Sequence, residues 1–239
     1  MEVYNKNRDS NHSMHDEIRE QNAKLKGAPL NEKISYFMEY YLKSTLAIIV
    51  VLILVCSFIY TMITAPEDTA FAAFFYNDTG DSSSTALIDE YITYIGIDTK
   101  KHEVYLDATM DYNADNSDYM AFTGLQKAMA VISTKELDII VSDQEAFDYF
   151  CASDCFHDVT TILSAELLER YKDQLYYYTF EETGKTYPVG IYVTDSPKLN
   201  EHAYYIDKEP ILGFISNSDS VENALTFLEF IYMESAPPA

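Results

Sequence analysis

The chain has 239 residues, with 39 acidic and 16 basic side chains and a formal net charge of −23. Acidic and basic residues balance within residues 1–43, so the whole excess of acid lies in residues 65–239. A surface of that sign repels phosphate backbones, and we therefore expect no nucleic-acid partner.

The N-terminal region is polar up to the first apolar segment. Residues 1–30 are expected to form a disordered cytoplasmic tail, because they hold few residues that could build a core. A juxtamembrane amphipathic helix is predicted over residues 31–43, with Asn31 as its N-cap. Its apolar face consists of Ile34, Phe37, Met38 and Tyr41. This helix is expected to lie against the membrane or to continue into the next segment.

Residues 44–64 form an uncharged apolar stretch, "STLAIIVVLILVCSFIYTMIT". As a helix it would be roughly 31 Å long, which matches the hydrocarbon core of a bilayer, and a single transmembrane helix is predicted. Lysines precede it and Glu67 and Asp68 follow it, so we expect a cytoplasmic N-terminus and an extracytoplasmic C-terminal domain in the cell membrane. A cleaved signal peptide fits less well, because the polar lead and the apolar core are both too long.

Strand and helix patterns alternate after the span. Apolar runs predict strands over 70–76, 102–109, 137–141, 186–193 and 210–216. Helical periodicity predicts helices over 86–96, 120–134, 145–153, 164–178 and 220–233. Successive strand–helix units favour a three-layer αβα domain over residues 65–233 with a mostly parallel sheet, and residues 234–239 are a tail. The last two strands are close in sequence and favour an antiparallel member.

Polar residues follow the first three predicted strands. In open α/β sheets, ligands bind beyond the carboxyl ends of the strands. The candidate ligand-binding residues at these ends are Asn77, Asp78, Thr79, Asp111, Ser142 and Asp143. The alternative interpretation is that they are solvated loop and cap residues.

Asp143 lies where many α/β enzymes place a nucleophile or a metal ligand. However, Ser142 and Glu145 have the spacing of a capping box, which would place Asp143 in the first helical turn, where the helix dipole favours an anion. Helix initiation therefore explains this segment, and no catalytic residue is predicted. The chain also lacks the common hydrolase, nucleotide and dinucleotide motifs, so we predict no cofactor.

The loop after the second strand begins like a calcium loop, with Asp111, Asn113 and Asp115 at alternate positions. The sixth position is Asn116 instead of glycine, and the twelfth is Phe122 instead of glutamate. The pattern therefore predicts a weak calcium site at most. Cys151 and Cys155 are four residues apart, a spacing that on a helix allows either a disulfide or two free thiols.

Four segments together resemble a known family: "LDIIVSDQEAFDYF" (137–150), "YPVGIYVTDSPKL" (187–199), "ILGFISNS" (211–218) and "ENALTFLEFIY" (222–232). They look like extracellular solute-binding proteins of the type 2 periplasmic-binding-protein fold, particularly membrane-anchored, uncharacterised members from Gram-positive bacteria. The resemblance implies a domain that binds a small molecule between two lobes. Only residues 193–210 separate the last two strands here, which is too short for a second lobe.

We therefore expect a single-lobe domain without a deep cleft. The favoured function is a non-enzymatic binding or interaction module anchored in the membrane, accessory to a transport or surface complex with a protein partner. The alternative is a solute-binding component of a transporter that recognises a small ligand at the carboxyl edge of the sheet. An enzyme is the second alternative.

Overall fold

The computed structural model of the chain describes residues 19, 23, 26, 27, 29–36, 38, 41–66, 68–112 and 119–234. Most of the predicted tail over 1–30, Asn113 and Asp115 of the candidate calcium loop, and the end of the C-terminal tail lie outside these residues. The chain divides into two compact units, residues 1–64 and 65–239, which are described separately below.

The first unit contains α2 (Leu30–Tyr36) and α3 (Leu42–Thr64). The N-cap prediction for Asn31 is wrong: α2 begins one residue earlier, because the Pro29 carbonyl accepts the Lys33 N–H at 3.3 Å and closes the first turn. The helix predicted over 31–43 corresponds to α2 and the start of α3, and Phe37, Glu39 and Tyr40 between them lie outside the described residues.

Helix α3 is a continuous apolar helix of 23 residues, and none of these residues is buried. Its length is about 34 Å at the usual helical rise. The hydroxyls of Thr61 and Thr64 bond to the carbonyls of Ser57 and Tyr60, at 2.9 and 2.8 Å, so these polar groups need no water. By length and composition, α3 is able to cross a membrane, although a signal sequence has the same properties.

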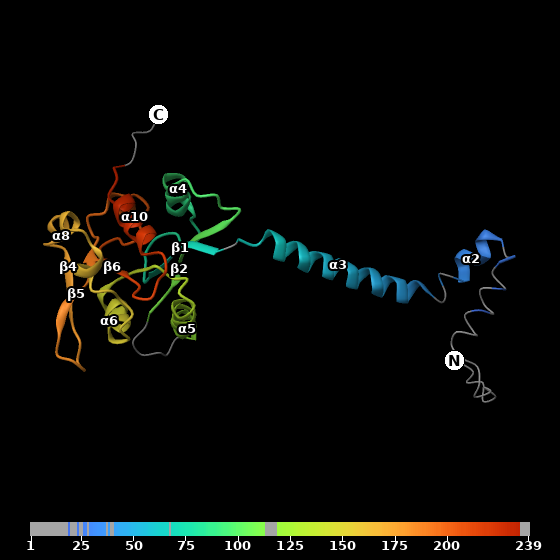
Figure 1. Cartoon of the computed structure of the whole chain (residues 1–239), viewed down its shortest axis with the longest axis horizontal. Helices are drawn as coiled ribbons and strands as arrows, with labels where there is room; N and C mark the ends of the chain where they lie inside the picture. Colours follow the sequence, from blue (N-terminus) through green and yellow to red (C-terminus); the bar gives the residue numbers. More distant parts are fainter. Residues whose placement is uncertain are drawn as a thin grey trace. The chain divides into compact units, whose positions relative to one another are not determined.

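The second unit is an α/β domain around a six-stranded mixed sheet (Figure 1). The strands are β1 (Asp68–Tyr76), β2 (His102–Met110), β3 (Ile139–Ser142), β4 (Leu175–Thr179), β5 (Thr186–Tyr192) and β6 (Ile211–Phe214). Their order is β2-β1-β3-β6-β5-β4. Strand β1 is parallel to β2 and β3, whereas β6, β5 and β4 join by antiparallel pairing. The α/β sheet with an antiparallel part agrees with the prediction, but three of the five strand pairs are antiparallel, so the sheet is mixed and not mostly parallel.

Helices cover both faces of the sheet (Figure 1). They are α4 (Ala86–Ile95), α5 (Tyr119–Ser133), α6 (Gln144–Ala152), α7 (Val159–Ile162), α8 (Ala165–Tyr171), α9 (Pro197–Glu201) and α10 (Val221–Ile231). Alternation along β1 divides the core: Phe71 and Phe75 pack on the side of α4 and α10, and Phe74 and Tyr76 on the side of α5 and α6. Gly96 follows α4 in the left-handed conformation and ends the helix.

The predicted helix over 164–178 is wrong in its second half. Helix α8 ends at Tyr171, and residues from Leu175 form β4. Tyr176 is buried beside Phe147, with ring centroids 5.3 Å apart, and its hydroxyl bonds to Asp148. Pairing with β5 and burial of this ring outweigh the helical spacing, and consecutive tyrosines also favour a strand.

Gly213 in β6 permits a close approach between the sheet and two stacked rings. A Cβ atom at Gly213 would lie 2.6 Å from the Phe156 ring and 2.8 Å from the Phe147 ring. These rings stack with centroids 4.4 Å apart, so neither moves freely. We expect Gly213→Ala to lower the free energy of unfolding by about 1–3 kcal/mol. Urea unfolding checks this against Gly27→Ala, where nothing lies within 4 Å, and equal midpoints for both variants would contradict it.

Candidate functional site

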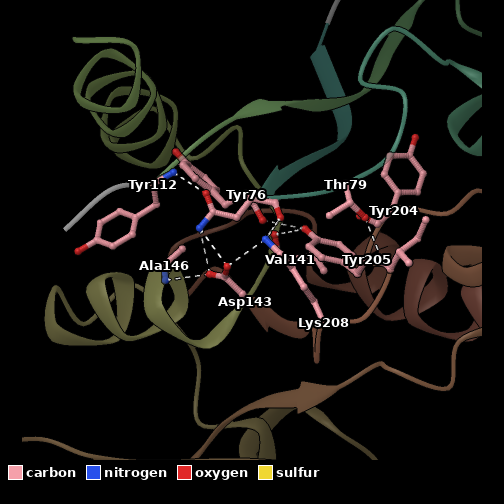
Figure 2. A network of polar contacts seen from close by, with 11 residues as sticks. Tyr76, Thr79, Tyr112, Val141, Asp143, Ala146, Tyr204, Tyr205 and Lys208 are labelled. Carbon is pink, nitrogen blue, oxygen red and sulfur yellow. Dashed lines mark hydrogen bonds and ion pairs between the residues drawn. The ribbon is translucent and has the colours of Figure 1, made fainter. Parts of the chain in front are cut away.

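The carboxyl edge of β1 and β3 brings together two of the predicted site residues. Tyr76 pairs with Ser142 in the parallel ladder, so the residues that follow, Asn77 and Asp143, lie side by side. The Asn77 amide nitrogen is 3.1 Å from each oxygen of the Asp143 carboxylate (Figure 2). Asn77 has a φ of 53°, a left-handed conformation that asparagine tolerates better than most residues.

Lys208 completes this polar cluster. Its ammonium nitrogen lies 2.5 Å from the Asn77 carbonyl oxygen and 3.3 Å from an Asp143 carboxylate oxygen (Figure 2). The other Asp143 oxygen accepts the Ala146 N–H at 3.3 Å and caps α6. The side chains of Asp143 and Lys208 are 25% and 33% exposed, so water screens the pair only in part. Both Asp143 oxygens are therefore occupied by the chain itself.

The predicted capping box at Ser142 is wrong. Asp143 is the N-cap of α6, and Ser142 is the last residue of β3. Ser142 pairs with Tyr76 on one side and Ile211 on the other, so the ladder holds its backbone extended and the helix begins one residue later. Its hydroxyl is fully buried and has no hydrogen-bond partner among the described residues. Ser142 is therefore not exposed at the edge where a ligand was predicted to bind.

The loop between α9 and β6 covers the same edge. The Tyr205 hydroxyl donates to the Val141 carbonyl at 2.8 Å and lies 3.2 Å from the Tyr76 carbonyl (Figure 2). It thereby gives the carbonyl groups near the ends of β3 and β1 a hydrogen-bond partner. Burial raises the pKa of this phenol well above its usual value, so it stays a donor. Thr79 anchors the loop: its N–H donates to the Tyr204 carbonyl at 2.6 Å, and its hydroxyl accepts the Ile206 N–H at 2.8 Å.

Asp78 and Asp111 complete the predicted set. An oxygen of Asp78 accepts the Gly80 N–H at 3.1 Å, which forms a local turn. The pKa of Asp78 is raised to about 6, mainly by burial and then by the charge of Asp111, against the lowering effect of the turn and of Lys208. Beside them, the Asn77 side-chain oxygen accepts the Tyr112 N–H at 2.7 Å.

Lys208 and Tyr205 were missed by sequence reasoning, which treated the segment before β6 as a connection. One signal was available: Lys208 is one of only nine basic residues in residues 65–239, and it stands just before a buried strand. This scarcity singles Lys208 out, but it does not identify Asn77 or Asp143 as its partners.

Cations and thiols add no second site within the described residues. No group of three or more His, Cys, Asp or Glu residues there could hold a metal ion. Cys151 and Cys155 are buried free thiols in the structure, and the turn at Asp154 lies between them. Burial raises the pKa of Cys155 to about 11 and that of Cys151 further, which keeps both thiols protonated and unreactive.

Comparison with known proteins gives no relative for this chain: no family model, curated protein or solved structure matches it. The resemblance to solute-binding proteins therefore stays a prediction from sequence pattern.

Proposed function

We propose that this protein is a membrane-anchored, non-enzymatic binding or interaction module, accessory to a transport or surface complex. The observation that carries this proposal is the occupied carboxyl edge of the sheet. Asn77, Asp143 and Lys208 bind one another there, and Tyr205 holds the neighbouring carbonyls. A domain whose usual ligand edge is engaged internally is better suited to bind partners through its outer surface.

Helix α3 is the anchor in this proposal. Residues 44–64 of this helix carry no charge and none of them is buried, so a lipid bilayer is a stable environment for them. Lys26, Lys33 and Lys43 precede the apolar stretch, and the acidic domain follows it, which favours a cytoplasmic N-terminus and an extracytoplasmic domain. The mixed sheet with helices on both faces supports one lobe of a type 2 periplasmic-binding-protein-like fold.

Cysteine labelling tests this orientation. In a Cys56→Ser background, a membrane-impermeant maleimide should label Thr183→Cys in intact cells, because Thr183 lies at an exposed turn of the domain. The same reagent should label Ser13→Cys only after permeabilisation. The buried thiols of Cys151 and Cys155 keep the background low. The reversed labelling pattern would overturn the proposed topology.

The second candidate function is a solute-binding component, which the convergence of polar groups at the carboxyl edge favours. A small ligand there must displace Lys208 from Asn77 and Asp143. Lys208→Ala should then strengthen binding, because the site no longer has an internal competitor. The same substitution has no such effect if the protein acts as an interaction module alone.

Thermal unfolding of the full chain in lipid nanodiscs distinguishes the two functions. Wild type and Lys208→Ala are each heated with pools of sugars, amino acids, peptides and Ca²⁺. A ligand at 100 times its dissociation constant adds about 2.7 kcal/mol, which raises the midpoint by roughly 5–10 °C. We expect no pool of small molecules to produce such a shift in either protein. A shift in midpoint that is larger in Lys208→Ala than in wild type would contradict the interaction module and support a solute-binding function.

A further inference from the structure

Strand β4 forms one edge of the sheet, and among the described strands it pairs only with β5. Its sequence, Leu-Tyr-Tyr-Tyr-Thr, contains no charge. The opposite edge, β2, carries His102, Glu103 and Asp107, and charged residues discourage a further strand from pairing. The two edges of the sheet therefore differ, and β4 is the edge that accepts another strand more readily.

Strands β4 and β5 form a hairpin, and its hydrogen-bond pattern shows which backbone groups of β4 face away from β5. The Phe180 N–H donates to the Lys185 carbonyl at 2.9 Å, so this pair is hydrogen-bonded across the hairpin. Bonded and non-bonded pairs alternate in an antiparallel ladder, which turns the N–H and C=O groups of Tyr177 and Thr179 away from β5. The Tyr177 residue is 57% exposed, so a second chain can reach these groups.

A groove of about 690 Å³ lies between this hairpin and the C-terminal end of α6. Three aromatic residues line it from one side: Tyr178, Phe180 and Tyr187. The Phe180 and Tyr187 rings stack with centroids 4.6 Å apart, and Tyr178 meets Phe180 edge to face at 5.1 Å. Such faces attract cationic side chains, arginine above all.

The charges around the groove have the matching sign. Asp154, Glu181 and Glu182 line it, against Lys185 as the one basic residue of its lining. The pKa of Tyr187 is raised, first by burial and then by the charge of Asp154, which agrees with their proximity. An acidic groove with an aromatic wall complements lysine or arginine and disfavours a second copy of this acidic chain.

We propose that a basic, extended segment of a partner protein pairs with β4 as an added strand and places lysine or arginine side chains in this groove. Main-chain pairing would supply affinity, and the aromatic and acidic side chains would select the cation. This inference rests on the proposed interaction function and names the surface and the partner chemistry for it.

The test uses the full chain in phosphatidylcholine nanodiscs and a fluorescent peptide of alternating arginine and valine. Anisotropy measures binding, and empty nanodiscs give the background. A second peptide has the same side chains but carries N-methyl groups on alternate residues, which removes its strand-pairing donors. We expect the methylated peptide to bind at least about tenfold more weakly, because several hydrogen bonds are lost. Equal binding of the two peptides would overturn strand addition.

A pair of charge-matched variants locates the site. The double substitution Glu181→Gln with Glu182→Gln should weaken binding about fivefold or more. The control, Glu222→Gln with Glu229→Gln, removes two exposed acids from α10, which packs on the other face of the sheet. It should change binding less than about twofold. Equal losses in both variants would show diffuse attraction to the acidic surface and overturn the proposed groove.

Photo-crosslinking in cells separates this inference from the proposed function. A photoreactive residue is placed at Tyr177 on β4 or at Tyr94 on α4, both of which are exposed. A protein crosslinked from Tyr177 and lost with Glu181→Gln and Glu182→Gln supports both proposals. A crosslink from Tyr94 alone keeps the interaction module but overturns the β4 surface. The absence of any crosslink from either position counts against both.

Discussion

The stability of the domain should fall by on the order of 3 kcal/mol between about pH 4 and pH 7 through Asp138 alone. Asp138 is 2% exposed, and burial raises its pKa to about 6 from an ordinary value of 3.8. The folded protein therefore holds this proton more tightly than the unfolded chain. The contribution of protonated Asp138 is fully present below pH 3.8 and is lost as the pH rises through about 6.

The buried Asp138 carboxylate accepts hydrogen bonds from groups on two segments of the domain. One oxygen accepts the Ala72 N–H at 2.8 Å, just before β3 begins to pair with β1, and the other accepts the Ser218 hydroxyl. The Asp138 carbonyl accepts the Ile215 N–H at 2.9 Å, which connects the same point to the end of β6. These bonds lower the pKa of Asp138, but less than burial raises it.

Asp138→Asn isolates this effect, since asparagine is close in shape and has no charge. We expect the variant to match wild type near pH 4 and to exceed its stability at pH 7 by up to about 3 kcal/mol. Asp138→Ala should lose about 1–3 kcal/mol near pH 4, because the Ala72 N–H loses its acceptor. This deficit should shrink toward pH 7, because alanine, like asparagine, carries no charge. Urea unfolding across this pH range, followed by tyrosine emission, measures both variants. Parallel pH profiles for wild type and Asp138→Asn would contradict the assignment.

The second large effect concerns Asp143 and its neighbour Ser142. Asp143→Ala should lower the free energy of unfolding by about 2–4 kcal/mol, because it removes the cap of α6 and leaves Asn77 and Lys208 without their common acceptor. Ser142→Ala should leave stability unchanged or raise it by about 1 kcal/mol, because its buried hydroxyl has no partner among the described residues.

This pair of variants is a matched comparison at adjacent positions that were both predicted to bind ligand. Urea unfolding of each variant gives the two free energies directly. A large loss in Ser142→Ala and none in Asp143→Ala would contradict the hydrogen-bond pattern at the edge. If Asp143→Ala keeps the stability of wild type but loses the binding of a small molecule, the result would favour the solute-binding function.

The sequence alone determined the features that depend on short stretches of chain. The apolar helix α3 follows from 21 uncharged residues, because the solvation of such a helix depends on its own side chains. Strands β1, β2 and β3, with the helix after each, follow from local periodicity and from signals such as Gly96. The acidity of residues 65–239 is likewise a property of composition.

The tertiary structure decided the features that depend on residues far apart in sequence. Leu175–Thr179 forms a strand because β5 pairs with it and Tyr176 is buried against Phe147, although the periodicity continued that of α8. The N-cap of α6 is Asp143 and not the predicted Ser142, because β1 and β6 pair with Ser142 on both sides and keep it in the sheet. Lys208 reaches Asn77 and Asp143 across 131 and 65 positions of sequence, and no local pattern encodes that contact. The closed edge of the sheet, on which the proposed function rests, is therefore a product of long-range packing.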